Sequence, residues 1–170
     1  MRRSKLHVLA IIPICIVLLA AGCAQIKPIM EDIKSTMKRT GDHSVYPLAE
    51  TQKRYSCGQD DIRFYVEQSE ISPGQVSPGD KIKHIVQYAL CAPSDAFTVQ
   101  GMITRKIKFK GKEIKLSTDS DTQIFKAGTW TVSAFIEVPK KAPSGTYTLE
   151  TIIRFEDKTI LRSGIFSIRE

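Results

Sequence analysis

The sequence predicts an all-β domain, an antiparallel sandwich of seven to nine strands, and two observations carry this prediction. From Cys57 to the end of the chain, apolar residues alternate with polar ones at a period of two, as in strands with one buried face. Clusters of Gly, Pro, Ser and Asp interrupt the alternation at short intervals, as turns do. Because no convincing helical pattern lies between these strands, two packed antiparallel sheets are favoured.

The expected strands follow one another closely from residue 62 onward. The first contains Ile62, Phe64 and Val66, and the turns 72–74 and 77–80 follow it. The others are marked by apolar positions on one face: Ile82, His84, Val86, Tyr88 and Leu90; Phe97, Val99, Ile103, Ile107 and Phe109; Ile114 and Leu116 after a hairpin turn at 110–112; Trp130, Val132, Ala134, Ile136 and Val138; Tyr147, Leu149, Ile153 and Phe155; and, after a turn at 157–158, Phe166 and Ile168.

A short amphipathic helix is predicted before the sandwich, over Pro28–Arg39. Ile29, Met30, Ile33 and Met37 recur at helical spacing, Pro28 suits a first helical turn, and Gly41 suits a C-terminal cap. Such a helix could bind a partner, lie along a membrane or pack on its own domain. Residues 41–56 show no period and are interpreted as linker, so that residues 23–56 form a tether and residues 57–170 the sandwich.

The N-terminus has the features of an export signal, assigned to residues 1–22. Arg2, Arg3 and Lys5 precede an apolar run, Val8–Leu19, which is too short to cross about 30 Å of hydrocarbon as a helix. The run ends in Leu19-Ala20-Ala21-Gly22-Cys23, which resembles the lipobox of bacterial lipoproteins, although Leu is commoner at position 20. The resemblance implies cleavage before Cys23 and lipidation of its thiol. An uncleaved anchor and ordinary secretion are the alternatives, and both also export the chain.

Lipidation of Cys23 would hold the protein on a membrane without a protein helix, since each buried CH₂ contributes about 0.8 kcal/mol. Residue 24 is Ala rather than Asp, which by resemblance to the sorting rule of enteric bacteria implies the outer membrane, facing the periplasm, if the source is Gram-negative. The formal charge of +7 falls to +4 when Arg2, Arg3 and Lys5 are removed. This small excess and the export signal argue against nucleic acid as a partner.

Two of the four cysteines remain for pairing in the exported domain. Cys15 leaves with the signal and Cys23 carries lipid, so Cys57 and Cys91 are expected to form a disulfide in an oxidising compartment. Two buried thiols are the alternative. A zinc site is not expected, because His43 and His84 lack ligand spacing, and no cofactor is predicted.

One stretch narrows the fold class. "VPKKAPSGTYTLE", residues 138–150, resembles the crossing between late strands of immunoglobulin-like domains, with Tyr147 placed as a tyrosine corner. Leu149 stands where antibody domains have cysteine, and Trp130 lies late in the chain. The pattern over residues 58–170 is therefore similar to the bacterial immunoglobulin-like and fibronectin-like class, and implies an immunoglobulin-like β-sandwich.

Candidate catalytic groups are few. His84 lies on an apolar strand face, which favours a hydrogen-bonded core residue over a catalyst, and no GxSxG motif accompanies it. Asp119-Ser120-Asp121 is interpreted as a turn, with a calcium site as the alternative. Asp60-Asp61 is interpreted as solvent-facing chain rather than a catalytic carboxylate pair. The chain is therefore predicted not to be an enzyme, and an envelope hydrolase would require an exposed His84 beside a carboxylate.

A basic stripe is the one candidate binding surface. In "RKIKFKGKEIK", residues 105–115, alternation puts Lys106, Lys108, Lys110 and Lys112 on one face of a hairpin. These lysines either meet anionic lipid, lipopolysaccharide or an acidic partner, or protect an edge strand against pairing.

The sequence thus predicts a lipid-anchored envelope protein whose sandwich binds or assembles with another envelope protein through a face or an edge. The alternative function is binding of anionic glycan or lipopolysaccharide by the lysine hairpin together with Tyr65 or Tyr88.

Overall fold

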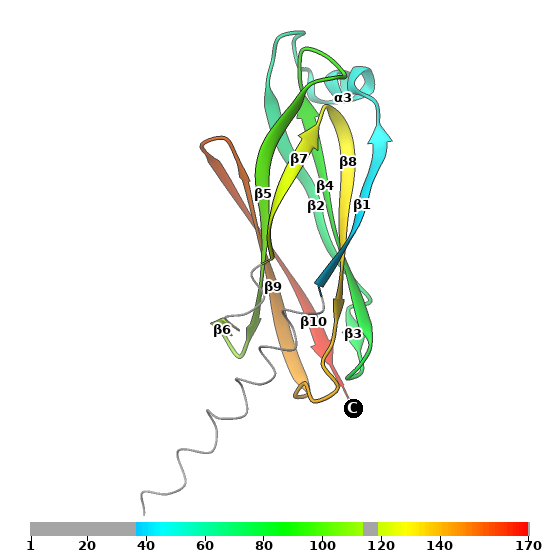
Figure 1. The fold of residues 1–170 in the computed structure, drawn as a ribbon, viewed down its shortest axis with the longest axis vertical. Coiled ribbons are helices and arrows are strands. Elements are labelled where there is room, and N and C mark those ends of the chain that lie inside the picture. Colours follow the sequence, from blue (N-terminus) through cyan, green and yellow to red (C-terminus); the bar gives the residue numbers. More distant parts are fainter. Residues whose placement is uncertain (1–36, 114–118, 170) are drawn as a thin grey trace, which may run out of the picture.

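A computed structural model describes residues 37–113 and 119–169, and in them the chain forms two β-sheets packed face to face (Figure 1). The four-stranded sheet has the order β1-β8-β4-β2. The six-stranded sheet has the order β3-β10-β9-β5-β6, with β7 also paired to β5. Neighbouring strands are antiparallel except β3 and β10, which are parallel. The predicted all-β sandwich is confirmed.

The elements have the following bounds: β1 Met37–Tyr46, α3 Leu48–Tyr55, β2 Arg63–Ser72, β3 Gln75–Val76, β4 Lys81–Cys91, β5 Thr98–Phe109, β6 Lys112–Glu113, β7 Asp119–Lys126, β8 Gly128–Glu137, β9 Gly145–Phe155 and β10 Lys158–Ile168.

The strand order is that of an immunoglobulin-like domain. When β2, β4 and β8 are matched to strands A, B and E, and β5, β9 and β10 to strands C, F and G, each set shares one sheet in the order such domains have. β1, although first in the chain, occupies the position of strand D beside β8. The hydroxyl of Tyr147 donates to the carbonyl oxygen of Pro143 at 2.9 Å, which is the bond of a tyrosine corner.

The linker interpretation of residues 41–56 is wrong, because this stretch belongs to the folded domain. Residues up to Tyr46 pair with β8, and Leu48–Tyr55 form the helix α3 at one end of the sandwich (Figure 1). β1 lies at a margin with most described side chains exposed, so it lacks the alternation by which a half-buried strand is recognised. The last three residues of the predicted tether helix, 37–39, are strand. The rest of that helix, the signal segment and Cys23 lie outside the described residues.

A second correction concerns Asp119-Ser120-Asp121, which was interpreted as a turn. These residues begin β7, whose backbone pairs with β5 from Thr98↔Lys126 to Arg105↔Asp119. The turn at Lys110-Gly111 is present, with both residues at positive φ. The predicted strand positions Ile114 and Leu116 lie outside the described residues.

The predicted disulfide between Cys57 and Cys91 is confirmed. It joins the chain just after α3 to the last residue of β4. α3 ends at Ser56, which has a left-handed conformation and whose N–H reaches back to the last helical turn. Thr51 also meets Thr129 of β8, hydroxyl to hydroxyl, at 2.9 Å. The helix is therefore fixed both to the end of β4 and to β8.

The interior consists of two apolar clusters. One lies toward α3 and is centred on Phe64, Tyr88, Phe125 and Phe155. The other lies toward the opposite end and comprises ten buried residues: Val76, Ile82, Ile107, Ile136, Val138, Ala142, Tyr147, Leu149, Phe166 and Ile168.

Candidate functional site

The margins of the two sheets decide where this sandwich can bind an extended partner. A strand at the margin of a sheet presents unpaired N–H and C=O groups, which can pair with another chain unless they are covered, bent or flanked by charge. Within the described residues, the four-stranded sheet ends at β1 and β2. The six-stranded sheet ends at β6 and β7 on one side, and at β10 with the short β3 on the other.

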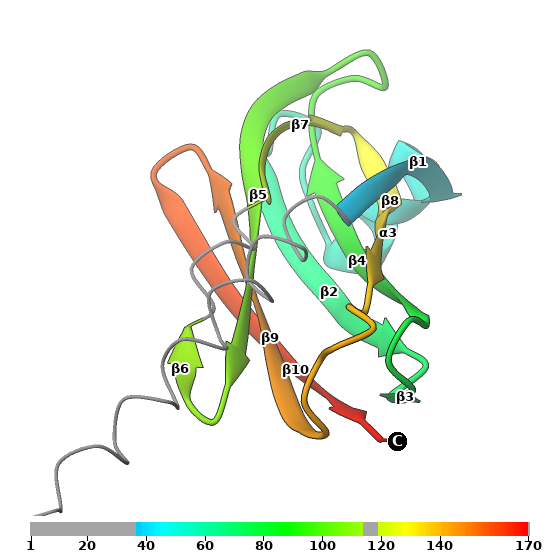
Figure 2. The same ribbon diagram turned by 60° about the horizontal axis from the view of Figure 1, so that its bottom comes forward.

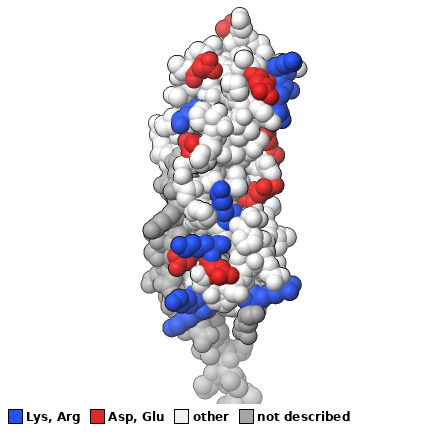
Figure 3. Space-filling model, turned by 90° about the vertical axis from the view of Figure 1, so that its right-hand side faces the viewer, with Lys and Arg blue, Asp and Glu red and all other residues white. Residues whose placement is uncertain are grey.

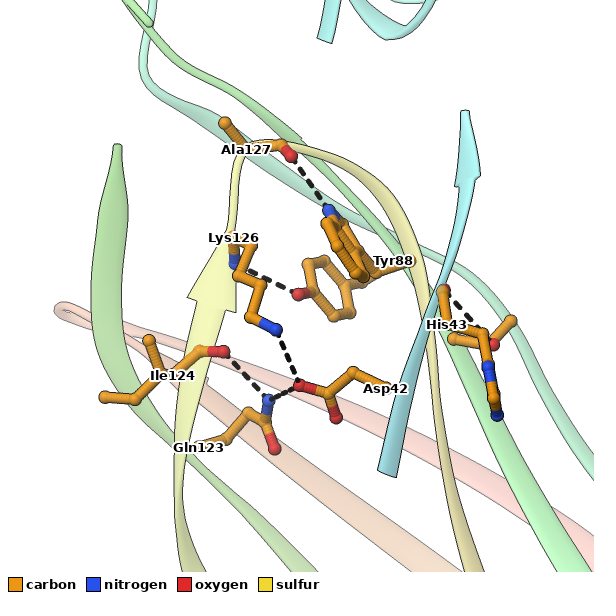
Figure 4. Close-up of polar contacts among 9 residues, drawn as sticks. Asp42, His43, Tyr88, Gln123, Ile124, Lys126 and Ala127 are labelled. Atoms are coloured by element: carbon orange, nitrogen blue, oxygen red, sulfur yellow. Dashed lines mark hydrogen bonds and ion pairs between the residues drawn. The ribbon is translucent and has the colours of Figure 1, made fainter. Parts of the chain in front are cut away.

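The margin formed by β1 and β7 is closed by polar contacts between the sheets (Figure 4). Oδ2 of Asp42 lies 3.6 Å from Nζ of Lys126 and accepts a hydrogen bond from Nε2 of Gln123 at 3.3 Å. The same amide nitrogen donates to the carbonyl oxygen of Ile124 at 2.9 Å, so a carbonyl on β7 is occupied from within the chain. β1 also has two register shifts, which bend it away from regular pairing.

Trp130 makes two contacts where β7 passes into β8. Its Nε1 donates to the carbonyl oxygen of Ala127 at 2.8 Å, and Nζ of Lys126 lies 4.7 Å from the ring centroid. The backbone N–H of Lys126 donates to the hydroxyl of Tyr88 at 3.0 Å. These contacts hold the corner at which the chain passes from one sheet to the other, and we assign them a structural role.

β2 is protected in a different way. Its register shifts between Val66 and Gln68, with the acidic Glu67 at the shift and Glu70 shortly after it. Arg162 of β10 donates from Nη2 to the carbonyl oxygen of Val66 at 3.2 Å. Gly164 allows this close approach of β10 and β2, because a Cβ there would lie 2.8 Å from Cδ1 of Ile71.

β10 is the long, regular margin. It pairs with β9 from Lys158↔Phe155 to Ile168↔Gly145 without a register shift, whereas β3 pairs only with Ser167 and Ile168. No described strand pairs with the other side of residues 159–165, which we call the open edge of β10. In Figures 1 and 2 the turn between β9 and β10 lies at the margin of the molecule, away from β1 and β8.

The hydrogen bonds of Ser167 and Arg169, at the end of β10, show which backbone groups of the open edge point outward. The N–H groups of Ser167 and Arg169 donate to Gly74 and Val76, on the side away from β9. Because these directions alternate along an antiparallel ladder, the odd-numbered residues of the open edge also direct their N–H and C=O groups outward. They are Thr159, Leu161, Ser163 and Ile165.

Two side chains of the open edge are large, apolar and exposed, although the edge also carries the charged Arg162. Leu161 is 55% exposed and Ile165 is 69% exposed, more than any other large apolar side chain among the described residues. Both lie on the outer face of the sheet, two pleats apart. The exposed Arg162 bridges part of this margin, since Nη1 donates to the carbonyl oxygen of Leu161 at 3.1 Å. A long edge without a register shift and with exposed apolar side chains favours strand pairing.

The sequence did not point to Leu161 and Ile165. Their signal was present, however: Ile160-Leu161 and Ile165-Phe166 place apolar residues on both faces of the last strand. Apolar residues on both faces are typical of a strand whose two faces are both buried, so this pattern indicates that the outer face is covered by a partner.

The predicted lysine stripe is only partly assembled. Nζ of Lys108 lies 2.7 Å from Oε1 of Glu150, and Lys106 is half-buried on the same strand. Lys110 and Lys112 are exposed at the turn and on β6. Since β5 has β9 on one side and β6 and β7 on the other, the interpretation of Lys106 and Lys108 as edge protection is wrong.

The tyrosines proposed to act with these lysines lie elsewhere. Tyr88 is fully buried, and Tyr65 belongs to the four-stranded sheet, where its ring stacks on Tyr55 at 4.4 Å between centroids. Tyr55 donates to Glu67, and burial together with this bond raises the pKa of Tyr55 to about 12. The structure therefore does not bring either tyrosine to the lysine hairpin. Figure 3 shows acidic and basic side chains interspersed on the face that it displays, the right-hand side of Figure 1.

His84 is a hydrogen-bonded core residue, as predicted. It is 1% exposed, and its Nδ1 accepts a hydrogen bond from Nε of Arg105 at 2.8 Å. Its Nε2 lies 3.0 Å from Oγ of Ser69 and 3.2 Å from Oγ1 of Thr151. Burial, and secondarily the charge of Arg105, lowers the pKa of His84 to about 3. A buried, neutral imidazole without a carboxylate partner in these contacts counts against a hydrolase.

Asp60-Asp61 does not form a carboxylate pair in the described contacts. Asp61 accepts from the N–H of Gly58 at 2.8 Å and pairs with Arg63 at 2.9 Å, as in a local turn. In residues 37–113 and 119–169, no three His, Cys, Asp or Glu side chains come together as a possible metal site.

Within the described part of the chain, no helix has the length and apolar character needed to cross a membrane.

No protein-family model and no curated protein matches the chain. Among solved structures it is similar to a β-glucosidase from Erythrobacter marinus, with a TM-score of 0.46, 10% identity, and coverage of 64% of this chain and 16% of that one. The sporulation control protein Spo0M from Bacillus subtilis has a TM-score of 0.44 and 10% identity, covering 63% and 49%. A family 123 glycoside hydrolase from Clostridium perfringens has a TM-score of 0.46 and 10% identity, covering 79% and 28%. This chain thus spans less than half of each of these proteins, and such distant likeness assigns no activity.

Proposed function

We propose that this chain is a non-enzymatic, lipid-anchored protein of the bacterial envelope, whose sandwich binds another envelope component by accepting a strand at the open edge of β10. One observation carries the binding part. The other described margins have register shifts, polar contacts between the sheets or charged side chains. Residues 159–165 pair with β9 without a register shift and direct backbone groups outward beside exposed Leu161 and Ile165, with only the carbonyl oxygen of Leu161 bonded, by Arg162.

The anchor part of the proposal is supported by the sequence around Cys23. Residues 24–36 separate that cysteine from β1, and a fully extended chain of this length spans at most about 45 Å. The sandwich would therefore stay close to the membrane, and in a Gram-negative cell it would face the periplasm from the outer membrane.

A binding role fits the chemistry of the described residues better than catalysis. His84 is enclosed in the core, and Asp61 is engaged in a local turn. Binding of anionic glycan is a weaker alternative, because Lys108 is paired with Glu150 and neither Tyr65 nor Tyr88 lies with the lysines.

Photo-crosslinking in intact cells tests the binding site. A photoreactive residue replaces Ser163, whose exposed side chain lies between Leu161 and Ile165, and in a matched control it replaces the exposed Thr122 on β7. We expect a discrete crosslinked protein from position 163 and none from position 122. Equal crosslinking from both positions, or none from position 163, would contradict the proposal.

A proline substitution tests the mode of binding. The N–H of Ser163 points away from β9, so Ser163→Pro removes a donor from the open edge without removing one from the β9–β10 ladder. In this variant the photoreactive residue replaces Ile165. We expect the yield of crosslinked product to fall by about tenfold, which corresponds to a loss of roughly 1.4 kcal/mol of binding free energy. Leu161→Lys should have the same effect, whereas Ile124→Lys, an equivalent change on β7, should have none.

A further inference from the structure

We infer that the open edge of β10 pairs with the same edge of a second copy of this chain, in an antiparallel arrangement about a twofold axis at Leu161. This inference rests on the proposed function of the open edge and names its occupant. Its basis is the length of the edge, the direction of its backbone groups and the position of its charges.

The open edge has two fixed ends. At one end lies the turn at Glu156-Asp157. At the other, Gly74 accepts the N–H of Ser167, and β3 occupies the adjoining position beside β10. A strand that enters must therefore fit between these two ends, and a second copy brings the same turn and the same β3 with it.

Three twofold registers pair at least three of the four outward residues Thr159, Leu161, Ser163 and Ile165, and two of these registers fail. An axis at Ser163 would place Thr159 of the second copy opposite Ser167, where β3 and Gly74 already lie. An axis at Arg162 would place the two Arg162 side chains directly opposite each other, and like charges at that position repel.

An axis at Leu161 satisfies both ends. Leu161 then lies opposite Leu161 of the second copy, and Thr159 opposite its Ser163. Each of these pairs exchanges two backbone hydrogen bonds, because the odd-numbered residues direct their polar groups outward. The turn of one copy ends level with Ile165 of the other, before β3 begins. The apolar Leu161 side chains meet on the outer face, which explains why a 55% exposed leucine lies on an open edge.

Arg162 adjusts when this pairing forms. Its Nη1 occupies the carbonyl oxygen of Leu161, which must accept the N–H of the other Leu161. A carbonyl oxygen has two lone pairs and the side chain is exposed, so Arg162 can share or leave this acceptor. Its second contact, with the carbonyl oxygen of Val66 at 3.2 Å, ties the same guanidinium to β2, so Arg162 must also shift or release this contact when the edges pair.

Pairing over so few residues is a small interface, and we expect it to be weak in dilute solution. Anchoring through Cys23 would confine copies to one surface and raise their effective concentration. The pairing should therefore be measured on the full-length, membrane-bound protein.

Introduced cysteines report the register. Cys57 and Cys91 are bonded to each other and Cys23 would carry lipid, so an added cysteine would be the free thiol of the mature chain. Opposite residues in a hydrogen-bonded pair have Cα atoms about 5.5 Å apart, which suits a disulfide. Under mild oxidation of membranes, we expect Leu161→Cys to give about ten times more covalent dimer than Thr122→Cys on β7, through the proximity that pairing creates.

Two further variants fix the axis. Thr159→Cys and Ser163→Cys should each fail to form a covalent dimer alone. With the axis at Leu161, the two copies of either residue are four positions apart along the paired strands, or about 14 Å. Coexpressed, they should form the mixed dimer. The double variant Leu161→Cys with Ser163→Pro should lose the crosslink, because the proline removes the N–H that Thr159 of the other copy accepts.

The outcomes separate this inference from the proposed function. Dimer from Ser163→Cys alone, or no excess of dimer from Leu161→Cys over Thr122→Cys, overturns pairing about Leu161. If position 163 then still photo-crosslinks to a different protein, the open edge is a binding site whose occupant is not a second copy. If position 163 crosslinks to nothing, the proposed function fails as well.

Discussion

Arg105 and His84 face each other across the interior of the sandwich, with Nε of Arg105 donating to Nδ1 of His84 at 2.8 Å. One residue comes from each sheet, and together with Ser69 and Thr151 they form a polar layer between apolar positions above and below. Because Nδ1 accepts, the proton of this neutral imidazole lies on Nε2, toward the two hydroxyl groups.

Loss of this acceptor should destabilise the domain. In His84→Leu, the Nε–H of a buried, charged guanidinium loses its acceptor, and we expect the free energy of unfolding to fall by about 3 kcal/mol. Urea denaturation followed by Trp130 fluorescence measures this change. The exposed Ser163→Ala is the control, and a loss below about 1 kcal/mol for His84→Leu would show that the layer does not depend on this bond.

The same pair predicts a pH dependence of stability. The folded-state pKa of His84, about 3, is below the ordinary value of 6.5, so the unfolded chain binds a proton that the folded chain does not. The contribution of His84 is fully present above pH 6.5 and is lost as the pH falls toward 3. We expect a slope of up to about 1.4 kcal/mol per pH unit in this window, relative to His84→Gln, which does not titrate. Parallel curves for the two proteins would contradict the assigned environment.

The tyrosine corner should contribute through one hydrogen bond. Tyr147→Phe keeps the ring stacked between Phe109 and Phe166 and removes only the bond to the carbonyl oxygen of Pro143. The expected loss is about 1 kcal/mol in the free energy of unfolding, measured by denaturant titration. Burial raises the pKa of Tyr147 to about 12, so spectrophotometric titration should show this phenol ionising later than an ordinary tyrosine.

The polar closure between β1 and β7 should hold the N-terminal strand on the domain. Asp42→Ala removes the acceptor of Gln123 and the partner of Lys126. We expect amide hydrogens of residues 40–46 to exchange about tenfold faster, since a local opening that costs roughly 1.4 kcal/mol less is ten times more populated. Lys83→Ala, a change of an exposed-face residue on β4, is the control, and unchanged exchange in Asp42→Ala would mean that pairing with β8 alone holds β1.

Three elements, β1, α3 and β7, could not be predicted from local sequence alone. β1 alternates poorly because it lies at a margin, and α3 has eight residues with two of them buried, so neither had a period to recognise. β7 begins with Asp119-Ser120-Asp121, a composition that favours turns, yet its backbone pairs with β5. In each case tertiary pairing outweighed local propensity, which is a weak effect per residue.

The sequence by itself determined the sandwich, the disulfide between Cys57 and Cys91, the buried state of His84 and the corner at Tyr147. The first three depend on spacing along a strand or on counting cysteines, and the corner on the resemblance of residues 138–150 to immunoglobulin-like domains, so all of this information is local. Only the tertiary structure decided that Lys106 and Lys108 lie within a sheet, that Glu150 pairs with Lys108, and that β10 has an open edge. Which strands are neighbours depends on pairing between distant segments, and a strand carries the same alternation whether its edge is covered or open.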